Sequence, residues 1–132
     1  RNTIVAEKNG QPVGALTQYD GARYLKMRQV TFPLIQQACG IDYSDMDLET
    51  HPGEYYLDSM AVLPEHRGQG IATALLKDGI ARATAAGITQ CSMIVSPENP
   101  EAQKLYESLG FHHVMTINAF HEEYRKMVRN NG

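Results

Sequence analysis

The segment from Tyr55 to Ala72 constrains this chain more than any other, because it runs a β-prone stretch through a glycine-bracketed turn into a helix. It reads YYLDSMAVLPEHRGQGIA and continues as TALLKDGIARATAAG. The first turn of a helix carries backbone N–H groups without intrahelical partners, and the aligned peptide dipoles place partial positive charge there. Gly68 and Gly70 keep side chains away from these amides, and Arg67 adds a fixed positive charge. The pattern therefore predicts a phosphate-binding turn.

Three phosphate-binding patterns can be compared with this turn. A P-loop requires GxxxxGK[ST], which the turn does not supply. The dinucleotide fingerprint GxGxxG requires a third glycine where Thr73 stands, and the next strand ends at Val95 without the acidic residue that this fingerprint needs. The remaining pattern is R-x-x-G-x-A, from Arg67 to Ala72, which resembles the acyl-CoA pyrophosphate loop of the GNAT family of N-acetyltransferases.

A second motif downstream supports the same resemblance. Asn99 to Phe111 reads NPEAQKLYESLGF, with Asn99 as the N-cap of a helix, Pro100 at its first position and Gly110 as its C-terminal stop. This motif resembles the second signature of the GNAT family. The two motifs occur in the family's order with a strand between them, so the chain is identified as a GNAT-like acyl-CoA N-acyltransferase.

The rest of the chain divides into short strands and helices. Two β-prone runs, Thr3 to Glu7 and Val13 to Tyr19, are joined through Asn9-Gly10, a pair that favours a tight hairpin turn. Ala22 to Ala38 has helical spacing, and Pro33 should kink or divide that helix. The pattern then predicts a strand (55–62), a helix (69–86), a strand (88–95), a helix (100–109) and two strands (112–119 and 123–128).

This order predicts an α/β (α+β) fold with a mixed, mostly antiparallel central sheet, flanking helices, a βαβ crossover and a terminal hairpin. In the helix over 69–86, an apolar stripe must face the sheet, formed by Ile71, Leu75, Leu76, Ile80 and Ala83. The GNAT resemblance covers residues 3 to 128. The strand and helix pair that usually open this fold are missing, so we expect residues 1–132 to be a single GNAT-like domain that is truncated at its N-terminus.

Composition narrows the remaining classes. The 132 residues, 42% apolar and 20% charged, suit one hydrophobic core. A net charge of −3 disfavours nucleic-acid binding, and no apolar run approaches the roughly 20 residues of a membrane span. Cys39 and Cys91 do not indicate a disulfide framework, and the five histidines lack metal-ligand spacing. We therefore expect a cytoplasmic protein without a metal or a membrane partner.

The resemblance assigns cofactor contacts to particular positions. It implies acetyl-CoA as co-substrate, with its pyrophosphate held by Arg67 and by the main-chain amides of Gly68, Gln69, Gly70, Ile71, Ala72 and Thr73. It also implies that the pantetheine arm pairs, as an added strand would, with the main chain of Met60, Ala61 and Val62. Such pairing requires a gap beside the first core strand, which the family creates by splaying it from the strand over 88–95.

Acyl transfer to an amine requires a deprotonated nucleophile, stabilisation of the oxyanion that forms on the thioester carbonyl, and a proton for the departing thiolate. The resemblance implies that Tyr106 gives its phenolic proton to the CoA sulfur, and a core aromatic is the alternative role for this residue. Asn99 resembles a position that contacts the cofactor, although an N-cap alone also explains it. The simplest oxyanion donor is a backbone N–H around Met60 to Val62.

Two carboxylates are candidates for the general base, because a free amine with a pKa of about 10.4 must lose a proton before it attacks. Glu54 and Asp58 lie at the start and in the middle of the core strand, and strand alternation places them on one face. The sequence leaves the choice between them open. Ile94 stands where some protein-acetylating relatives carry a glutamate, which disfavours ribosomal-protein or N-terminal acetylation.

The stretch from Asp42 to Asp58 contains six carboxylates and no lysine or arginine. It is either a solvated loop or the border of an acceptor site, where its field would attract a cationic amine such as a polyamine, an aminoglycoside or a lysine side chain. The sequence thus predicts transfer of an acetyl group from acetyl-CoA to the primary amine of a small molecule or peptide, by direct attack.

Two alternatives to this activity remain. One is a non-catalytic acyl-CoA-binding module, and the other is a transferase that uses another acyl group or a hydroxyl acceptor. In either case a missing opening strand would expose a sheet edge, which is compatible with a homodimer.

Overall fold

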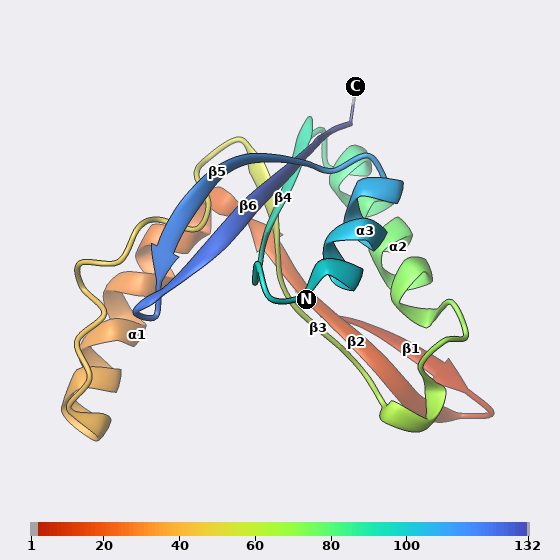
Figure 1. The fold of residues 1–132 in the computed structure, drawn as a ribbon, viewed down its shortest axis with the longest axis horizontal. Coiled ribbons are helices and arrows are strands. Elements are labelled where there is room, and N and C mark those ends of the chain that lie inside the picture. The colour runs from red at the N-terminus through yellow and green to blue at the C-terminus, as the bar shows by residue number, and fades with distance from the viewer. Residues whose placement is uncertain (1–2, 132) are drawn as a thin grey trace.

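A six-stranded, strongly twisted sheet forms the centre of the protein in a computed structural model that describes residues 3–131 (Figure 1). The helix α1 lies on one face of the sheet, and α2 and α3 lie on the other (Figure 1). The elements in chain order are β1 (Thr3–Lys8), β2 (Gln11–Asp20), α1 (Tyr24–Cys39), β3 (Glu54–Val62), α2 (Ile71–Ala85), β4 (Gln90–Val95), α3 (Pro100–Ser108), β5 (His112–Ala119) and β6 (Glu122–Asn130). Short 3₁₀ turns, Gly21–Arg23 and Pro64–His66, precede α1 and α2.

The sheet order is β1-β2-β3-β4-β6-β5, and only β3 and β4 run parallel. The expected mixed, mostly antiparallel α/β architecture is therefore confirmed. The terminal hairpin folds back so that β6, the last strand, lies between β4 and β5. Within residues 3–131, no helix has the length and apolarity that crossing a membrane demands.

Two helices differ from the sequence prediction. The first does not divide at Pro33 but runs as one helix, Tyr24–Cys39, with this proline inside. Contacts on both sides of Pro33 hold it together, since Arg28 donates to carbonyls of the following loop and the Gly40 amide closes the C-terminus on the Gln36 carbonyl. The second begins at Ile71 rather than at residue 69, because left-handed backbone angles at positions 68 and 70 cannot continue a helix.

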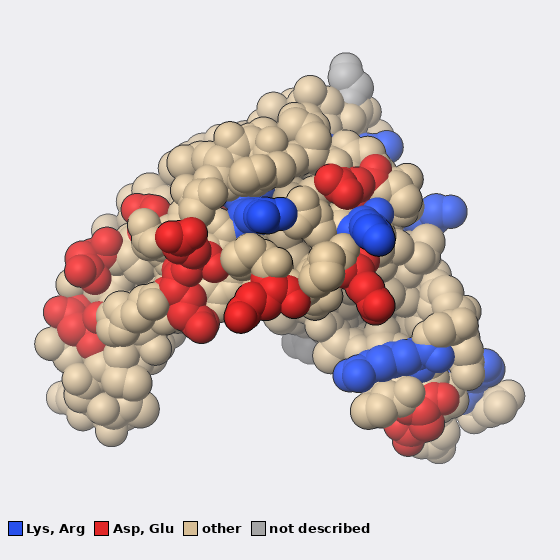
Figure 2. All heavy atoms as spheres, viewed as in Figure 1, with Lys and Arg blue, Asp and Glu red and all other residues tan. Residues whose placement is uncertain are grey.

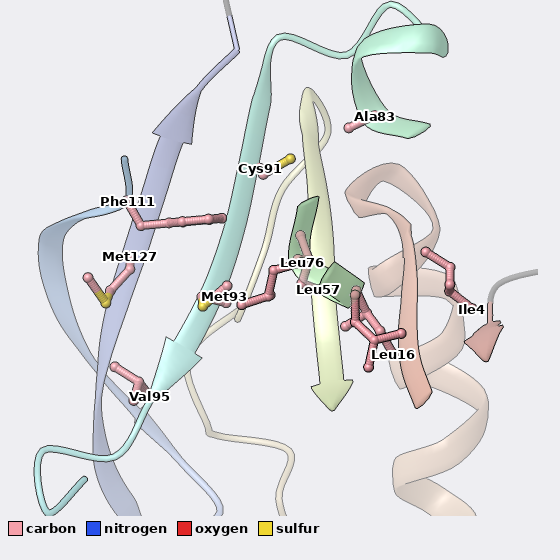
Figure 3. Close-up of a cluster of buried hydrophobic side chains, with 11 residues drawn as sticks. Ile4, Leu16, Leu57, Leu76, Ala83, Cys91, Met93, Val95, Phe111 and Met127 are labelled. Atoms are coloured by element: carbon pink, nitrogen blue, oxygen red, sulfur yellow. The ribbon is translucent and has the colours of Figure 1, made fainter. Parts of the chain in front are cut away.

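The main core lies between α2, α3 and the sheet (Figure 3). The expected stripe of α2 is confirmed, because Leu75, Leu76 and Ala83 are buried and Ile71 and Ile80 pack against the same cluster. These side chains meet apolar side chains from five strands and from the segment after α3, among them Ile4, Leu16, Leu57, Met93, Phe111 and Met127. Burial of this cluster fixes where the start of α2 lies relative to the sheet.

The junction between β2 and α1 depends on a glycine. Gly21 is buried, and a β-carbon there would lie 2.2 Å from the His51 carbonyl oxygen and 2.7 Å from the Thr50 hydroxyl. The backbone of β2 therefore approaches the segment before β3 more closely than any other residue allows.

We predict that Gly21→Ala lowers the free energy of unfolding by about 3 kcal/mol, because the added methyl group clashes with backbone atoms that cannot move aside. Gly10→Ala is the control, since Gly10 has a φ of 78° but nothing within 4 Å of where its β-carbon would lie. It should cost only about 1 kcal/mol of left-handed backbone strain. Urea unfolding of both variants measures the difference, and equal losses would contradict the proposed close approach.

A buried ion pair connects β3 to β6. The Lys126 ammonium lies 2.8 and 3.1 Å from the two carboxylate oxygens of Glu54, and only 3% of the Lys126 side chain is exposed. The Thr50 hydroxyl donates to Glu54 at 2.8 Å and lies 3.3 Å from the Ser92 hydroxyl of β4. Burial alone would raise the pKa of Glu54, but the hydrogen bonds from Lys126 and Thr50 lower it below its usual value.

We predict that Lys126→Met destabilises the protein by about 3–5 kcal/mol near pH 7, because it leaves a buried carboxylate without its cation. With its pKa lowered, Glu54 stabilises the wild-type fold above its unfolded pKa of 4.5 and loses that contribution as the pH falls through the folded value. In the variant the pKa of Glu54 should rise instead, so its deficit in unfolding free energy should shrink toward about pH 5.

Two controls accompany this measurement. Glu54→Gln combined with Lys126→Met should recover part of the loss, because no charge then remains buried. Arg82→Met, which breaks the exposed pair of Arg82 with Asp78, should cost less than about 0.5 kcal/mol. A deficit of Lys126→Met that is the same at both pH values would contradict this role of the ion pair.

Candidate active site

The strands β3 and β4 separate after a short paired region (Figure 1). They pair over only three positions, from Glu54 with Gln90 to Tyr56 with Ser92, although β3 continues to Val62. From Leu57 onward, the edge of β3 that faces β4 therefore has no pairing with that strand. This is the gap that the resemblance to the GNAT family implies.

A cavity of about 150 Å³ lies in this gap. Residues 57–60 of β3 line one side, Met93 and Ile94 of β4 line another, and α3 contributes Tyr106. Figure 3 shows Leu57 and Leu76 between the diverging strands, below the point where the strands are closest. Most residues around the cavity are apolar, and Asp58, Ser59 and Tyr106 are polar, but most of the surface that lines it is polar.

A β-bulge places Asp58 at this cavity. The register of β2 with β3 passes from Thr17 opposite Ser59 to Gln18 opposite Leu57, so Asp58 has no partner in the ladder. Bulges of this kind redirect a side chain and occur often beside active sites. Asp58 also lines a second cavity, of about 180 Å³, on the α1 face of the sheet. Asp58 thus contributes to the lining of both cavities, and its carboxylate accepts a hydrogen bond from Tyr19, which lines the second one.

The surroundings of Asp58 make it a stronger base than a free aspartate. Burial raises the pKa of Asp58, and a hydrogen bond from the Tyr19 hydroxyl at 3.3 Å opposes part of this rise. Burial and the nearby Asp58 charge in turn raise the pKa of Tyr19, so this phenol stays protonated and acts as a donor. One side of Asp58 remains open to solvent, which allows protons to leave the site.

The turn before α2 has the shape that the sequence predicts for a phosphate site. Gly68 and Gly70 have φ angles of 78° and 79°, and Gly70 caps α2 without any side-chain hydrogen bond to its first amides. No atom of the described residues, chain neighbours aside, lies within 4 Å of where their β-carbons would be, so this side of the turn is open. The guanidinium of Arg67 donates to the Val62 carbonyl at 3.2 Å, which attaches the turn to the end of β3.

Lys8 joins this turn, although no motif in the sequence points to it. Its ammonium donates to the side-chain oxygen of Gln69 at 2.7 Å, from the hairpin between β1 and β2. That hairpin was predicted, but only the sheet order and the contact of Leu63 with Val13 bring its tip beside the turn. A second positive charge, in addition to Arg67, therefore stands next to the start of α2.

The second motif also has a defined geometry. Tyr106 is half-buried, its ring packs edge-on against Phe111 with centroids 6.3 Å apart, and burial raises its phenolic pKa. Asn99 caps α3 as predicted, because its side chain accepts from the Ala102 amide at 3.2 Å.

The structure brings some of the candidate residues together and separates others. Asp58, Met60 and Tyr106 line one cavity, while Ala61 and Val62 continue the open edge of β3 toward the phosphate turn. Glu54 does not line either cavity at Asp58 and is held by Lys126 at the paired end of the strand.

Acidic and basic side chains lie mainly over different parts of the molecule (Figure 2). In this view a deep notch separates two arms of the molecule, and most acidic atoms lie over the arm that carries α1. Most basic atoms lie over the half that carries α2 and α3 (Figure 2). On the face that Figure 2 shows, an anionic ligand is therefore favoured over α2 and α3, and a cationic one over the arm that carries α1.

Comparison with known proteins leads to the same family that the sequence motifs resemble. Residues 1–111 match the acetyltransferase (GNAT) family. A mycothiol acetyltransferase of Thermobispora bispora is 42% identical over 59 residues, which are 45% of this chain and 19% of that protein, so the chain matches only about a fifth of that relative's length.

Solved structures share the whole fold. A crystal structure described as an acetyltransferase superposes with a TM-score of 0.79 at 26% identity, over 99% of this chain and 70% of the other. An N-acetyltransferase from Staphylococcus aureus Mu50 gives a TM-score of 0.78 at 24% identity, over 96% and 69% of the two chains. The chain belongs to the GNAT acetyltransferase family.

Proposed function

We propose that this protein transfers an acetyl group from acetyl-CoA to a primary amine, by direct attack of the amine on the bound thioester. The observation that carries the proposal is the cavity between the separated strands, which has Asp58 and Tyr106 in its lining, and from which β3 continues without pairing to β4 toward the phosphate turn. The proposed base Asp58, the proposed acid Tyr106 and the phosphate turn would then all lie along the path of one bound ligand.

The cofactor fits this path in three parts. The amides of residues 68–73 would bind the pyrophosphate, with Arg67 and Lys8 supplying positive charge. The pantetheine arm would pair with the open edge of β3 at Met60, Ala61 and Val62, where β4 has already turned away. The thioester would then lie in the cavity next to Tyr106, and Asn99 at the start of α3 would contact the arm in addition to capping the helix.

The proposed chemical steps follow from the protonation states of the Asp58 carboxylate and the Tyr106 phenol. The bound ammonium first loses one proton through Asp58 to solvent, and the neutral amine nitrogen then attacks the thioester carbonyl. A second proton on the nitrogen becomes acidic as the new C–N bond forms, so the carboxylate of Asp58 can accept it. A backbone N–H of residues 60–62 would stabilise the oxyanion. When the C–S bond breaks, the neutral phenol of Tyr106 gives its proton to the thiolate, which leaves as CoA. No covalent bond to the enzyme forms in this sequence.

Asp58 is a better base than Glu54 on physical grounds. Burial raises the pKa of Asp58, whereas the Lys126 ammonium and the Thr50 hydroxyl overcome the effect of burial and lower that of Glu54. A carboxylate whose pKa is lowered accepts a proton less readily, and Glu54 would also have to break its ion pair. We therefore assign the base to Asp58 and a structural role to Glu54.

We predict that the protein binds CoA, as measured by titration calorimetry, and that Lys8→Met weakens this binding about fivefold because one positive charge beside the phosphates is lost. Lys26→Met is the matched control, because Lys26 is exposed on α1, on the opposite face of the sheet. It should leave CoA binding unchanged. Absence of CoA binding by the wild-type protein would refute the proposed function.

We predict that Asp58→Asn lowers kcat/KM about 100-fold and removes the decline of the rate at acid pH, since only the ionised carboxylate accepts the proton. Tyr106→Phe should lower kcat about tenfold while CoA binding persists. Release of free thiol from acetyl-CoA in the presence of primary amines measures both rates.

Glu54→Gln is the comparison variant for this experiment. It should keep kcat within about twofold of wild type at a temperature where it is folded, because its carboxylate is structural. The base assignment is reversed if Glu54→Gln is inactive and Asp58→Asn is not. CoA binding without thiol release for any amine would indicate a non-catalytic acyl-CoA-binding module.

A further inference from the structure

The second cavity at Asp58 lies on the α1 face of the sheet, opposite the face that carries α2. It has a volume of about 180 Å³ and is bounded by β2, α1, the segment before β3 and the tip of the β5–β6 hairpin. Asp58 lines this cavity and the one between the strands. Asp58 is therefore the residue that this cavity shares with the cavity proposed for the thioester.

Two carboxylates lie in this cavity. Glu49 is only 6% exposed, and it accepts hydrogen bonds from the hydroxyls of Tyr24, at 3.1 Å, and of Tyr56. Burial and the nearby charge of Asp58 raise the pKa of Glu49, although the tyrosine hydroxyls oppose this rise. The tyrosine donors of Glu49 carry no positive charge, and the charge of Arg28 opposes only part of the rise in the pKa of Glu49, so a bound cation would lower the cost of keeping two negative charges together.

Most of the remaining lining of the cavity is apolar. Met27, Phe32 and Ile35 come from α1, and Phe120 comes from the tip of the hairpin. Phe120 and the next residue, His121, have φ angles of 53° and 62°, a left-handed conformation that bulky residues adopt only under constraint. Tyr43 packs on both rings with centroids 5.2 and 5.1 Å away, and so keeps Phe120 over the cavity.

Arg28 limits which cations can enter. Its guanidinium lines the cavity 4.8 Å above the Phe32 ring and donates to the carbonyls of Ser44, Met46 and Asp47. These bonds hold its positive charge in a fixed place on the wall. A ligand with a second ammonium group would meet this charge, whereas a ligand with an apolar body would not.

The other acids of the stretch before β3 do not face this cavity. Asp42 accepts a hydrogen bond from the Ser44 amide, and Asp47 accepts one from the Asn118 amide. Asp45 is exposed, and Glu54 is in the ion pair with Lys126. The acidic stretch therefore presents one carboxylate, that of Glu49, in addition to Asp58 at this site.

We propose that this cavity binds the acceptor, and that the acceptor is a primary amine with a single positive charge and a compact apolar or aromatic group. Asp58 and Glu49 contact its ammonium, and the α1 side chains and Phe120 contact its apolar part. This inference rests on the proposed function, which it makes more specific. It disfavours the polyamines and aminoglycosides that the acidic stretch alone suggests.

The direct test is calorimetric binding of 2-phenylethylamine to the CoA-saturated protein. The amine should bind at least about tenfold more tightly than 2-phenylethanol, which has the same ring but no charge, because a charged hydrogen bond is lost with the alcohol. It should also bind at least about tenfold more tightly than spermidine, because Arg28 repels the additional charges.

Three variants localise the binding. Glu49→Gln, which can still accept the tyrosine hydrogen bonds, should weaken binding of the amine about tenfold. Asp45→Asn removes the same charge from an exposed position and should have no effect. Phe120→Gly should weaken binding about fivefold while it relieves the left-handed strain, so the melting temperature should not fall in proportion. The last variant keeps the test valid if Glu49→Gln folds poorly.

The possible failures can be told apart. Equal binding of the amine and the alcohol, tighter binding of spermidine, or no amine binding at all would overturn the inference. If CoA still binds and another amine supports thiol release in that case, the proposed function stands. If the protein neither binds CoA nor releases thiol with any amine, the proposed function fails, and binding of the amine alone still reports on the cavity.

Discussion

The early end of pairing between β3 and β4 is the constraint on which the rest of the site depends. Parallel strands usually continue side by side, but here the ladder stops at Tyr56 and Ser92, and Leu57 of β3, Leu76 of α2 and Met93 of β4 line the space that opens. β3 keeps its pairing with β2 on its other edge. Beyond Tyr56, therefore, only the backbone groups on the edge that faces β4 lack a partner strand there. The backbone groups on this open edge can pair with a ligand that offers matching amide groups.

The same strand carries two carboxylates whose environments give them different roles. Glu54 lies in the paired region, where Lys126, Thr50 and Ser92 surround it and lower its pKa. Asp58 lies at the bulge, beyond the paired region, where burial raises its pKa and the neutral Tyr19 donates to it. Two carboxylates that lie only four positions apart on one strand can thus have different roles, one structural and one reactive. The separation of the strands and the bulge cause this difference.

Charge is distributed so that the phosphate turn suits an anionic ligand and the cavity on the α1 face suits a cationic one. The phosphate turn combines α2 amides with Arg67 and Lys8 on one side of the molecule, and Glu49 lies with Asp58 on the other. Opposite charges on the two sides favour a ligand with phosphates on one path and an amine on the other. Asp58 stands at the meeting point of these paths, which is the position that a base for this reaction needs.

The elements and the local chemistry of the turn follow from the order of residues along the chain. Glycines at 68 and 70, the Asn99 cap and the apolar spacing of α2 act through neighbouring residues, so their effects can be read along the chain. Three other pairs depend on the folded sheet: Lys8 with Gln69, Lys126 with Glu54, and Glu49 with Asp58. The first two come together through the sheet order across 61 and 72 positions, and the third through a bulge that shifts the strand. The roles of the carboxylates were open in the sequence for this reason: a pKa depends on what surrounds a group in space, and residue spacing does not contain that information.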